Sequence, residues 1–181
     1  MRVLLVGSSA RGLELARRLT ADGHAVRAVT RTEARRAELQ DSGCECWIGD
    51  PDRIGTLRYA LENVTILVWA LGTASGPDAE QIAALHGSRL RMMLDKTTDT
   101  TVRGVLYEAT GTLDASTLAA GVQEVLLANR ANEIPYALLE ADGTDAGAWA
   151  KAALEGIATL LAPRPLAGQG AWPTQAPVSR P

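Results

Sequence analysis

The first 32 residues hold the feature that most constrains the fold, a glycine-rich turn between an apolar run and an amphipathic segment. The apolar run is 3–6, the turn is 7–12 with the sequence Gly-Ser-Ser-Ala-Arg-Gly, and the amphipathic segment is 13–22. A second apolar run follows and ends at Arg31. This order predicts a strand, a tight turn, a helix and a second strand. Because the free N–H groups and the dipole of a helix start favour a pyrophosphate, we predict a dinucleotide site at this turn.

The turn keeps the two outer glycines of the pattern G-x-G-x-x-G and has serine at the middle position. Gly7 permits the sharp turn off the strand, and Gly12 lets the helix and the strand pack closely. Ser9 is small enough for phosphates to approach the backbone, and its hydroxyl is able to donate to a phosphate oxygen. We predict that the cofactor contacts every residue of the turn, namely Gly7, Ser8, Ser9, Ala10, Arg11 and Gly12. The alternative is an α/β turn that binds nothing.

The end of the second predicted strand indicates which dinucleotide binds. An NAD site usually has Asp or Glu there for the ribose hydroxyls, whereas an NADP site needs cations for the 2′-phosphate. This strand ends at Arg31 without an acid, and Arg11 lies inside the glycine turn. Guanidinium groups bind phosphates through paired hydrogen bonds, so NADP(H) is favoured over NAD(H). We interpret Arg35 and Arg36, which follow one turn further on, as solvated helix residues.

Two later loops supply further predicted contacts with the cofactor. Asp50 follows the third predicted strand and is able to accept a hydrogen bond from the adenine amino group, although capping of the next helix also explains it. The segment 65–71 is the most apolar of the chain, as is typical of a parallel strand covered on both faces. Leu71, Gly72 and Thr73 stand at its carboxyl end, where ribose or nicotinamide rests in a doubly wound sheet. A plain connecting loop is the alternative there.

Apolar segments alternate with helical segments along the chain at the spacing of βαβ units. The predicted strands are 3–6, 25–29, 45–48, 65–71, 104–109 and 136–139, and the predicted helices are 13–22, 33–41, 53–62, 79–94, 114–130 and 145–161. We therefore predict an α/β fold with a single doubly wound, mostly parallel six-stranded sheet, strand order 3-2-1-4-5-6, and helices on both faces. This domain spans 1–162. We expect residues 163–181, which are rich in Pro and Gly, to form a largely disordered tail unless Trp172 docks.

Composition argues against several other classes of protein. Hydrophobic residues are 46% and charged residues 22% of 181 residues, a balance typical of one globular domain. A net charge of -3 argues against nucleic acid or an anionic membrane as partner. No apolar stretch approaches the roughly 20 residues that cross a bilayer, and we expect a cytoplasmic protein without a signal peptide. Cys44 and Cys46 are expected to be reduced, and so few His and Cys do not support a metal site.

Taken together, these residues resemble the NAD(P)-binding Rossmann family of atypical and extended short-chain dehydrogenases, including the NmrA-like members. The resemblance covers about residues 1–160, and its most specific motifs lie in the first half. They are 6–12, the strand end 29–31, the turn 49–52 with Leu57, Ala60 and Leu61 after it, and the strand end 68–72, followed by weaker matches at 104–110 and 134–136. The resemblance implies a Rossmann fold with a bound nicotinamide dinucleotide.

The same resemblance implies a catalytic Ser or Thr at the end of the fifth strand, followed by a Tyr-x-x-x-Lys pair. Thr110 or Thr112 matches the first position. The pair has no match, because after Tyr107 the next tyrosine is Tyr136, and Glu140 stands four residues later. In such enzymes the tyrosine exchanges a proton with the substrate oxygen, and the lysine lowers its pKa. The usual route of hydride transfer therefore lacks its acid/base.

Two hypotheses follow from the missing pair. The first is a nucleotide-binding redox sensor or regulator that reports NADP(H) to a partner. The second is an NADPH-dependent oxidoreductase of unusual mechanism that acts on an unknown small molecule, with Tyr107, Glu108 or Thr110 assisting.

Two further readings of the sequence remain open. S-adenosylmethionine binding would use a similar turn, but Arg31 argues against it. A scaffold for homo-oligomerisation or a protein partner would use an apolar helix face, although core packing explains that face equally well. The residues of this face are Leu118, Val122, Val125 and Leu126.

Overall fold

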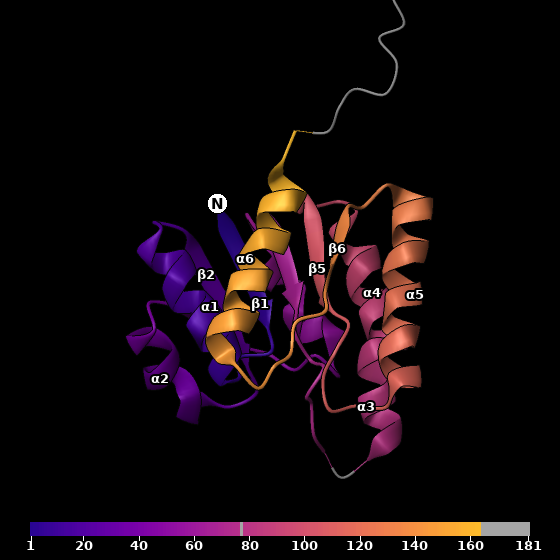
Figure 1. Ribbon diagram of the computed structural model, residues 1–181, viewed down its shortest axis with the longest axis horizontal. Helices are drawn as coiled ribbons and strands as arrows, with labels where there is room; N and C mark the ends of the chain where they lie inside the picture. Colours follow the sequence, from indigo (N-terminus) through magenta and orange to yellow (C-terminus); the bar gives the residue numbers. More distant parts are fainter. Residues whose placement is uncertain (77, 164–181) are drawn as a thin grey trace, which may run out of the picture.

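The computed structural model describes residues 1–76 and 78–163, which form one sheet covered by helices (Figure 1). The strands are β1 (Arg2–Val6), β2 (Ala25–Thr30), β3 (Glu45–Ile48), β4 (Ile66–Trp69), β5 (Gly104–Glu108) and β6 (Tyr136–Leu139). All pairs are parallel, in the order β3-β2-β1-β4-β5-β6. The predicted fold class and strand order are confirmed. Nearly all of the predicted tail, Trp172 included, lies outside the described residues.

The helices cover both faces of the sheet. One face carries α1 (Ala10–Ala21), η1 (Glu33–Arg35), α2 (Arg36–Asp41) and α6 (Ala146–Leu161), and the other carries η2 (Ile54–Leu57), η3 (Tyr59–Leu61), α3 (Ala79–His86), α4 (Ser88–Thr97) and α5 (Ala115–Asn132). Figure 1 shows α1 and α6 side by side in front of the sheet. Within the two described ranges, no helix has the length and apolar character needed to cross a membrane.

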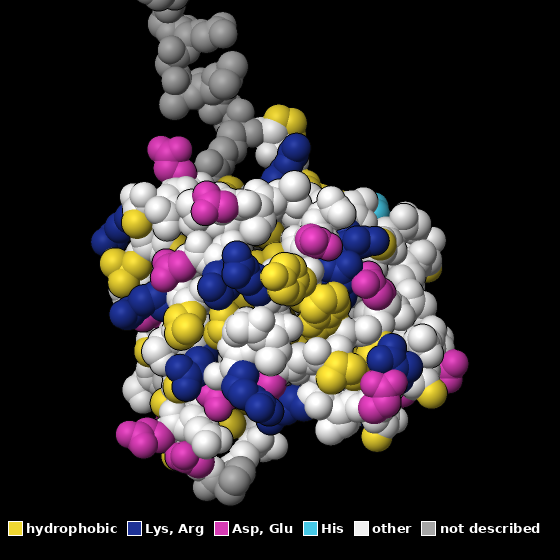
Figure 2. Space-filling view, turned by 180° about the vertical axis from the view of Figure 1, so that it is seen from behind, with side chains coloured by type: hydrophobic (Ala, Val, Ile, Leu, Met, Phe, Trp, Pro, Cys, Tyr) yellow, Lys and Arg dark blue, Asp and Glu magenta, His cyan; other side chains and the backbone are white. Residues whose placement is uncertain are grey.

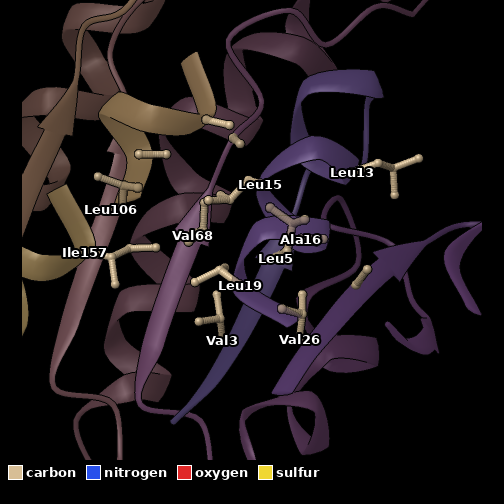
Figure 3. Packing of buried hydrophobic residues seen from close by; sticks show 14 of the residues in the cluster. Val3, Leu5, Leu13, Leu15, Ala16, Leu19, Val26, Val68, Leu106 and Ile157 are labelled. Carbon is tan, nitrogen blue, oxygen red and sulfur yellow. The ribbon is translucent and has the colours of Figure 1, made fainter. Parts of the chain in front are cut away.

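The centre of the sheet is buried on both faces, and β1 shows how. Its successive side chains point to opposite sides, as in any strand. Val3 and Leu5 join the cluster beneath α1 and α6, whereas Leu4 and Val6 join the cluster beneath α4 and α5. Figure 3 shows Val3 and Leu5 close to Leu19 of α1. This packing holds the end of β1, and the glycine turn after it, in one position.

Two of the predicted helices take a different form, and the helix predicted for 33–41 begins with the 3₁₀ turn η1 before α2. The segment 53–62 folds into the 3₁₀ turns η2 and η3, and the Thr56 carbonyl there accepts a hydrogen bond from Trp47 Nε1 at 3.0 Å. The segment 79–94 becomes α3 and α4, because Gly87 between them has a non-helical backbone with φ -111° and ψ -103°. Both changes lie on the face opposite α1 and leave the strand order intact.

The apolar positions of α5 mostly serve the core of the protein itself. Leu118 and Val125 are buried, and Val122 packs against the cluster on that side. Leu126 is half-buried. Core packing therefore accounts for most of the face that a scaffold hypothesis would use. Figure 2 shows the molecule from behind, where some hydrophobic side chains are exposed among charged ones.

Candidate functional site

The carboxyl ends of β1 and β4 lie where consecutive connections leave the sheet on opposite faces. The loop after β1 leads to α1 on one face, and the loop after β4 leads to α3 on the other. A crevice at such a point is the usual ligand site of a doubly wound sheet. The predicted turn 7–12 meets the end of the predicted strand 65–71 there, since Gly7 lies directly against the Ala70 backbone, and the predicted loop 72–76 follows this strand.

Both outer glycines of the turn are required by the backbone around them. Gly7 has φ +113°, and a Cβ on it would collide with the Ala70 carbonyl oxygen. A Cβ on Gly12 would collide with the Gly7 carbonyl oxygen. The roles predicted for these two positions, a sharp turn and close helix–strand packing, match this geometry.

The start of α1 has no side-chain cap. Ser9 is the N-cap residue, its backbone is extended, and its side chain makes no capping hydrogen bond. The Ser9 carbonyl accepts from the Leu13 N–H at 2.9 Å. The N–H groups of Ala10, Arg11 and Gly12 therefore come before the first hydrogen bond of the helix and have no partner within it. These groups, at the positive end of the helix dipole, suit a phosphate.

A pocket of about 300 Å³, the first pocket, lies beside the turn on the β2–β3 side. It brings together residues from the ends of β1, β2, β3 and β4. Its lining residues are Ser8, Val29, Thr30, Arg31, Thr32, Arg35, Gly49, Pro51, Leu71, Ala74 and Ser75. Polar and cationic side chains from the end of β2, the residues after it and η1 thus share one pocket with the predicted contacts Ser8 and Leu71.

Arg31 and Asp50, both predicted contacts, are joined to each other. Arg31 Nε donates to Asp50 Oδ1 at 3.0 Å, and the Arg31 side chain is 53% exposed. The same carboxylate accepts from the Asp52 N–H at 3.1 Å, so Asp50 caps the turn after β3. Burial raises the pKa of Asp50, but the Asp52 N–H and the guanidinium groups of Arg31 and Arg53 lower it by more, so it lies below its usual value.

Arg35 lines the first pocket, which the sequence interpretation missed. Its Nη1 donates to Ser8 Oγ at 3.1 Å, and the Ser8 hydroxyl donates to the Val29 carbonyl at 3.0 Å. Arg36 turns the other way and pairs with Glu33. Helical phase was the only signal in the sequence that separated the two arginines, because neighbours in a helix point about 100° apart.

A second pocket, of about 470 Å³, lies on the β5–β6 side of the turn. It joins the start of α1 to the loops after β4, β5 and β6. Its lining residues are Arg11, Thr73, Thr110, Gly111, Thr112, Glu140, Asp142, Gly143 and Thr144. Thr73 and Thr110 are predicted site residues, and Thr110 Oγ1 donates to the Ala141 carbonyl at 2.9 Å.

Arg11 is buried beside Glu108, an arrangement that the sequence did not predict. Arg11 Nη2 lies 2.8 Å from Glu108 Oε1 and donates to Thr73 Oγ1 at 2.8 Å. Glu108 Oε1 also accepts from Trp149 Nε1 at 2.8 Å, and Oε2 accepts from the Gly72 N–H at 2.7 Å. The Arg11 guanidinium lies 5.3 Å from the centre of the Trp149 ring. Glu108 therefore ties the starts of α1 and α6 and the loop after β4 to the end of β5.

Tyr107 is buried on the opposite side of the sheet. Its hydroxyl lies 2.7 Å from His86 Nδ1 and 3.1 Å from the Leu118 carbonyl. His86 Nε2 lies 3.2 Å from the Leu71 carbonyl. The His86 ring thus bridges the Tyr107 hydroxyl and the Leu71 carbonyl. Burial raises the pKa of Tyr107, with a smaller contribution from Glu108. The assisting roles weighed for Tyr107 and Glu108 stay predictions, and both side chains have structural partners here.

A family model described as NAD(P)H-binding matches residues 7–146. No curated protein sequence matches the chain.

The solved structures similar to this chain include complexes with dinucleotides. A short-chain dehydrogenase/reductase superfamily protein from Agrobacterium tumefaciens with bound NAD has 16% identity and a TM-score of 0.64, with 77% of this chain and 48% of that one covered. UDP-glucuronic acid 4-epimerase from Bacillus cereus, in complex with UDP-glucuronic acid and NAD, has 13% identity and a TM-score of 0.62, with 77% of this chain and 56% of that one covered.

Triphenylmethane reductase from Citrobacter sp., in complex with NADP(H), has 21% identity and a TM-score of 0.57, with 77% of this chain and 49% of that one covered. The chain thus spans about half the length of these proteins. At such low identity the likeness shows the fold. The set includes complexes with NAD and with NADP(H), so it leaves the preferred cofactor undecided.

Proposed function

The chain belongs to the NAD(P)H-binding family, and from this premise we propose that it binds NADP(H), in preference to NAD(H), along the carboxyl edge of its sheet. The start of α1 fits the pyrophosphate. Its N–H groups are not capped by Ser9, and Gly7 and Gly12 let the turn and the helix start pack closely, which holds these N–H groups in place. Adenine would lie in the first pocket near Asp50, and the ribose and nicotinamide would lie along Leu71, Gly72 and Thr73.

The observation that carries the preference for NADP(H) is the pair of arginines in the first pocket. Arg31 and Arg35 both line it, from the end of β2 and from η1. Their present partners, Asp50 and Glu38, form exposed or half-exposed ion pairs, which contribute little to stability. A 2′-phosphate carries nearly two negative charges and accepts several hydrogen bonds, so it competes well for both guanidinium groups.

Binding without the usual catalysis favours a redox sensor or regulator. The sequence lacks the Tyr-x-x-x-Lys pair. Tyr107 and Glu108, the acid/base candidates nearest to the crevice, are buried and engaged with His86 and Arg11. Such a protein would report the bound dinucleotide to a partner.

The second pocket favours an alternative function, an NADPH-dependent oxidoreductase of unusual mechanism. This pocket adjoins the predicted nicotinamide position and contains the Thr110 side chain. The bound dinucleotide would supply the hydride there, while Thr110 would orient a small molecule. Oxidation of NADPH that depends on an added small molecule and is lost in Thr110→Val would support this alternative over the sensor.

Calorimetric titration tests the proposed NADP(H) site. We expect wild-type protein to bind NADPH more tightly than NADH. Arg31→Ala should weaken NADPH binding about 10- to 100-fold, because it removes a charge-assisted hydrogen bond, and should leave NADH binding within about twofold. Arg53→Ala is the matched control, since Arg53 also contacts Asp50 but does not line the first pocket. Equal losses for both dinucleotides, or no loss, would refute the assignment of Arg31 to the 2′-phosphate.

A further inference from the structure

Arg11 presents one nitrogen to the second pocket. Its Nη2 is engaged by Glu108 and Thr73, and its Nε is buried without a hydrogen-bond partner among the described residues. Nη1 lies on the other side of the guanidinium, beside Gly143, where a Cβ would be only 2.6 Å away. Within the ranges that the structure covers, no residue accepts a hydrogen bond from Nη1. The Arg11 side chain is 8% exposed and belongs to the lining of this pocket.

The two carboxylates of the lining have the opposite hydrogen-bonding character. Glu140 and Asp142 are exposed at the rim, and the other side chains of the lining are the hydroxyls of four threonines. The Thr144 N–H donates to Asp142 Oδ1 at 2.9 Å, and this bond lowers the pKa of Asp142. An ionised carboxylate only accepts hydrogen bonds, and a guanidinium only donates them. Carbon atoms, the threonine methyl groups among them, make up most of the exposed lining surface, and these polar groups stand among them.

We propose that the second pocket binds a small, uncharged hydroxylated carbonyl compound of the ketose or aldose class. Its carbonyl oxygen accepts from Arg11 Nη1, and its hydroxyl groups donate to Glu140 and Asp142. They also exchange hydrogen bonds with the threonines of the lining other than Thr73, which is bonded to Arg11 and adjoins the proposed nicotinamide position. The acceptor and the donors of such a molecule match the donor and the acceptors of the pocket.

Charge selects against an anionic ligand of the same size. Glu108 already neutralises Arg11, and Glu140 and Asp142 add two carboxylates at the rim. A carboxylate ligand would therefore meet a net negative pocket. Glu108 is a positioning residue, because it holds Nη2 and thereby directs Nη1 at the ligand.

The first experiment is saturation-transfer NMR of the full chain, without dinucleotide, with L-erythrulose as the probe. Erythrulose is an open-chain hydroxyketone. Erythritol lacks the carbonyl, and hydroxypyruvate is an anionic hydroxyketone. We expect millimolar binding of erythrulose and at least about tenfold weaker binding of the other two, as for the loss of one charged hydrogen bond or the addition of one repelled charge. Absence of erythrulose binding, or equal binding of the three compounds, would overturn the proposal.

The matched variants are two glycine-to-alanine changes. Gly143→Ala puts a methyl group against Nη1 and leaves Arg11 and Glu108 in the chain, whereas a Cβ on Gly55 would meet nothing within 4 Å. Erythrulose binding should fall at least about tenfold in Gly143→Ala and stay unchanged in Gly55→Ala. Arg11→Lys is the second test, since it keeps a cation for Glu108 but removes the forked donor, and it should cause a similar loss. Retained binding in both Gly143→Ala and Arg11→Lys would contradict the role of Nη1.

Competition separates this site from the proposed dinucleotide site. Adenosine 2′,5′-bisphosphate carries the adenosine and the 2′-phosphate but no nicotinamide, so it should bind without displacing erythrulose. NADPH should also bind together with erythrulose. If NADPH displaced erythrulose, the second pocket would belong to the nicotinamide end of the cofactor and the proposal would be wrong. Failure of the Arg31→Ala titration would not affect any of these results, so the two proposals fail separately.

Discussion

The two halves of the carboxyl edge use arginine in contrasting ways. On the β2–β3 half, Arg31 and Arg35 are partly exposed and paired with carboxylates at the surface. On the β5–β6 half, Arg11 is buried against Glu108, whose two oxygens also accept from Trp149 and Gly72. Surface ion pairs contribute little to stability and are readily exchanged for a ligand, whereas a buried pair is costly to break.

Because of this contrast, one edge of the sheet has both arginines that are able to change partners and an arginine that is held in place. The arginines that are free to exchange partners line the first pocket, where a phosphate is proposed to bind. The arginine that is held in place aligns the loops around the second pocket. The Leu71–Gly72 peptide between the two pockets is held from both sides, by His86 at its carbonyl and by Glu108 at its N–H.

Removal of Glu108 should give the largest effect. Glu108→Ala leaves Arg11 buried and unpaired, and it deprives Trp149 and Gly72 of their acceptor. We expect a loss of about 3–5 kcal/mol in the free energy of unfolding, measured by urea denaturation. Glu38→Ala, which breaks the exposed pair with Arg35, is the control and should change it little. Similar losses in the two variants would remove the contrast between the halves.

Arg35 should have the next largest effect, on affinity instead of stability. Arg35→Ala removes the donor to Ser8 and one of two cations of the first pocket. NADPH binding should weaken about tenfold in calorimetry, which is equivalent to about 1.4 kcal/mol, while the unfolding midpoint in urea stays the same. A loss of stability without a loss of NADPH affinity would show that Arg35 stabilises the fold and does not bind the ligand.

His86 should make the stability of the protein sensitive to acid. Burial lowers the pKa of His86 and outweighs the opposing hydrogen bond to Leu71, so the folded protein binds this proton less readily than the unfolded chain does. The contribution of neutral His86 to the free energy of unfolding is complete above the unfolded pKa of about 6.5. It is lost as the pH falls below that value, by at most about 1.4 kcal/mol per pH unit.

Urea denaturation between pH 7 and pH 5 measures this slope. His86→Gln should flatten it, and His24→Gln, which removes the other histidine, should retain it. An unchanged slope in His86→Gln would assign the acid sensitivity to other groups.

Arg36 should show the smallest effect. Its guanidinium pairs with Glu33 on the surface and does not line the first pocket. Arg36→Ala should leave both the NADPH affinity and the urea midpoint within the error of the measurement. A tenfold loss of NADPH affinity would show that the first pocket extends to this side of η1, and that Arg36 is as available to the phosphate as Arg35.

The sequence predicted the fold well because the signals for it are local. β1 and β4 are continuous apolar runs with glycine turns after them, and their periodicity and spacing are enough to specify buried parallel strands. The glycine turn was also predicted from its residues alone, since Gly7 and Gly12 stand where any side chain would collide with a carbonyl oxygen. The break at Gly87 was missed, because a glycine within an apolar helical pattern is compatible with a continuous helix.

The site was predicted only in part, because its chemistry depends on partners far apart in the chain. The role of Arg11 at the phosphates stays a prediction, but its counter-ion Glu108, 97 positions away in the chain, was not predicted. Arg35 looked like a surface residue until the end of β2 and the start of η1 turned it toward Ser8. Residue type and position along the chain by themselves determined a dinucleotide-binding sheet and its glycine turn. Only the tertiary structure decided which arginine is buried and which is free, because burial and pairing arise where distant segments meet.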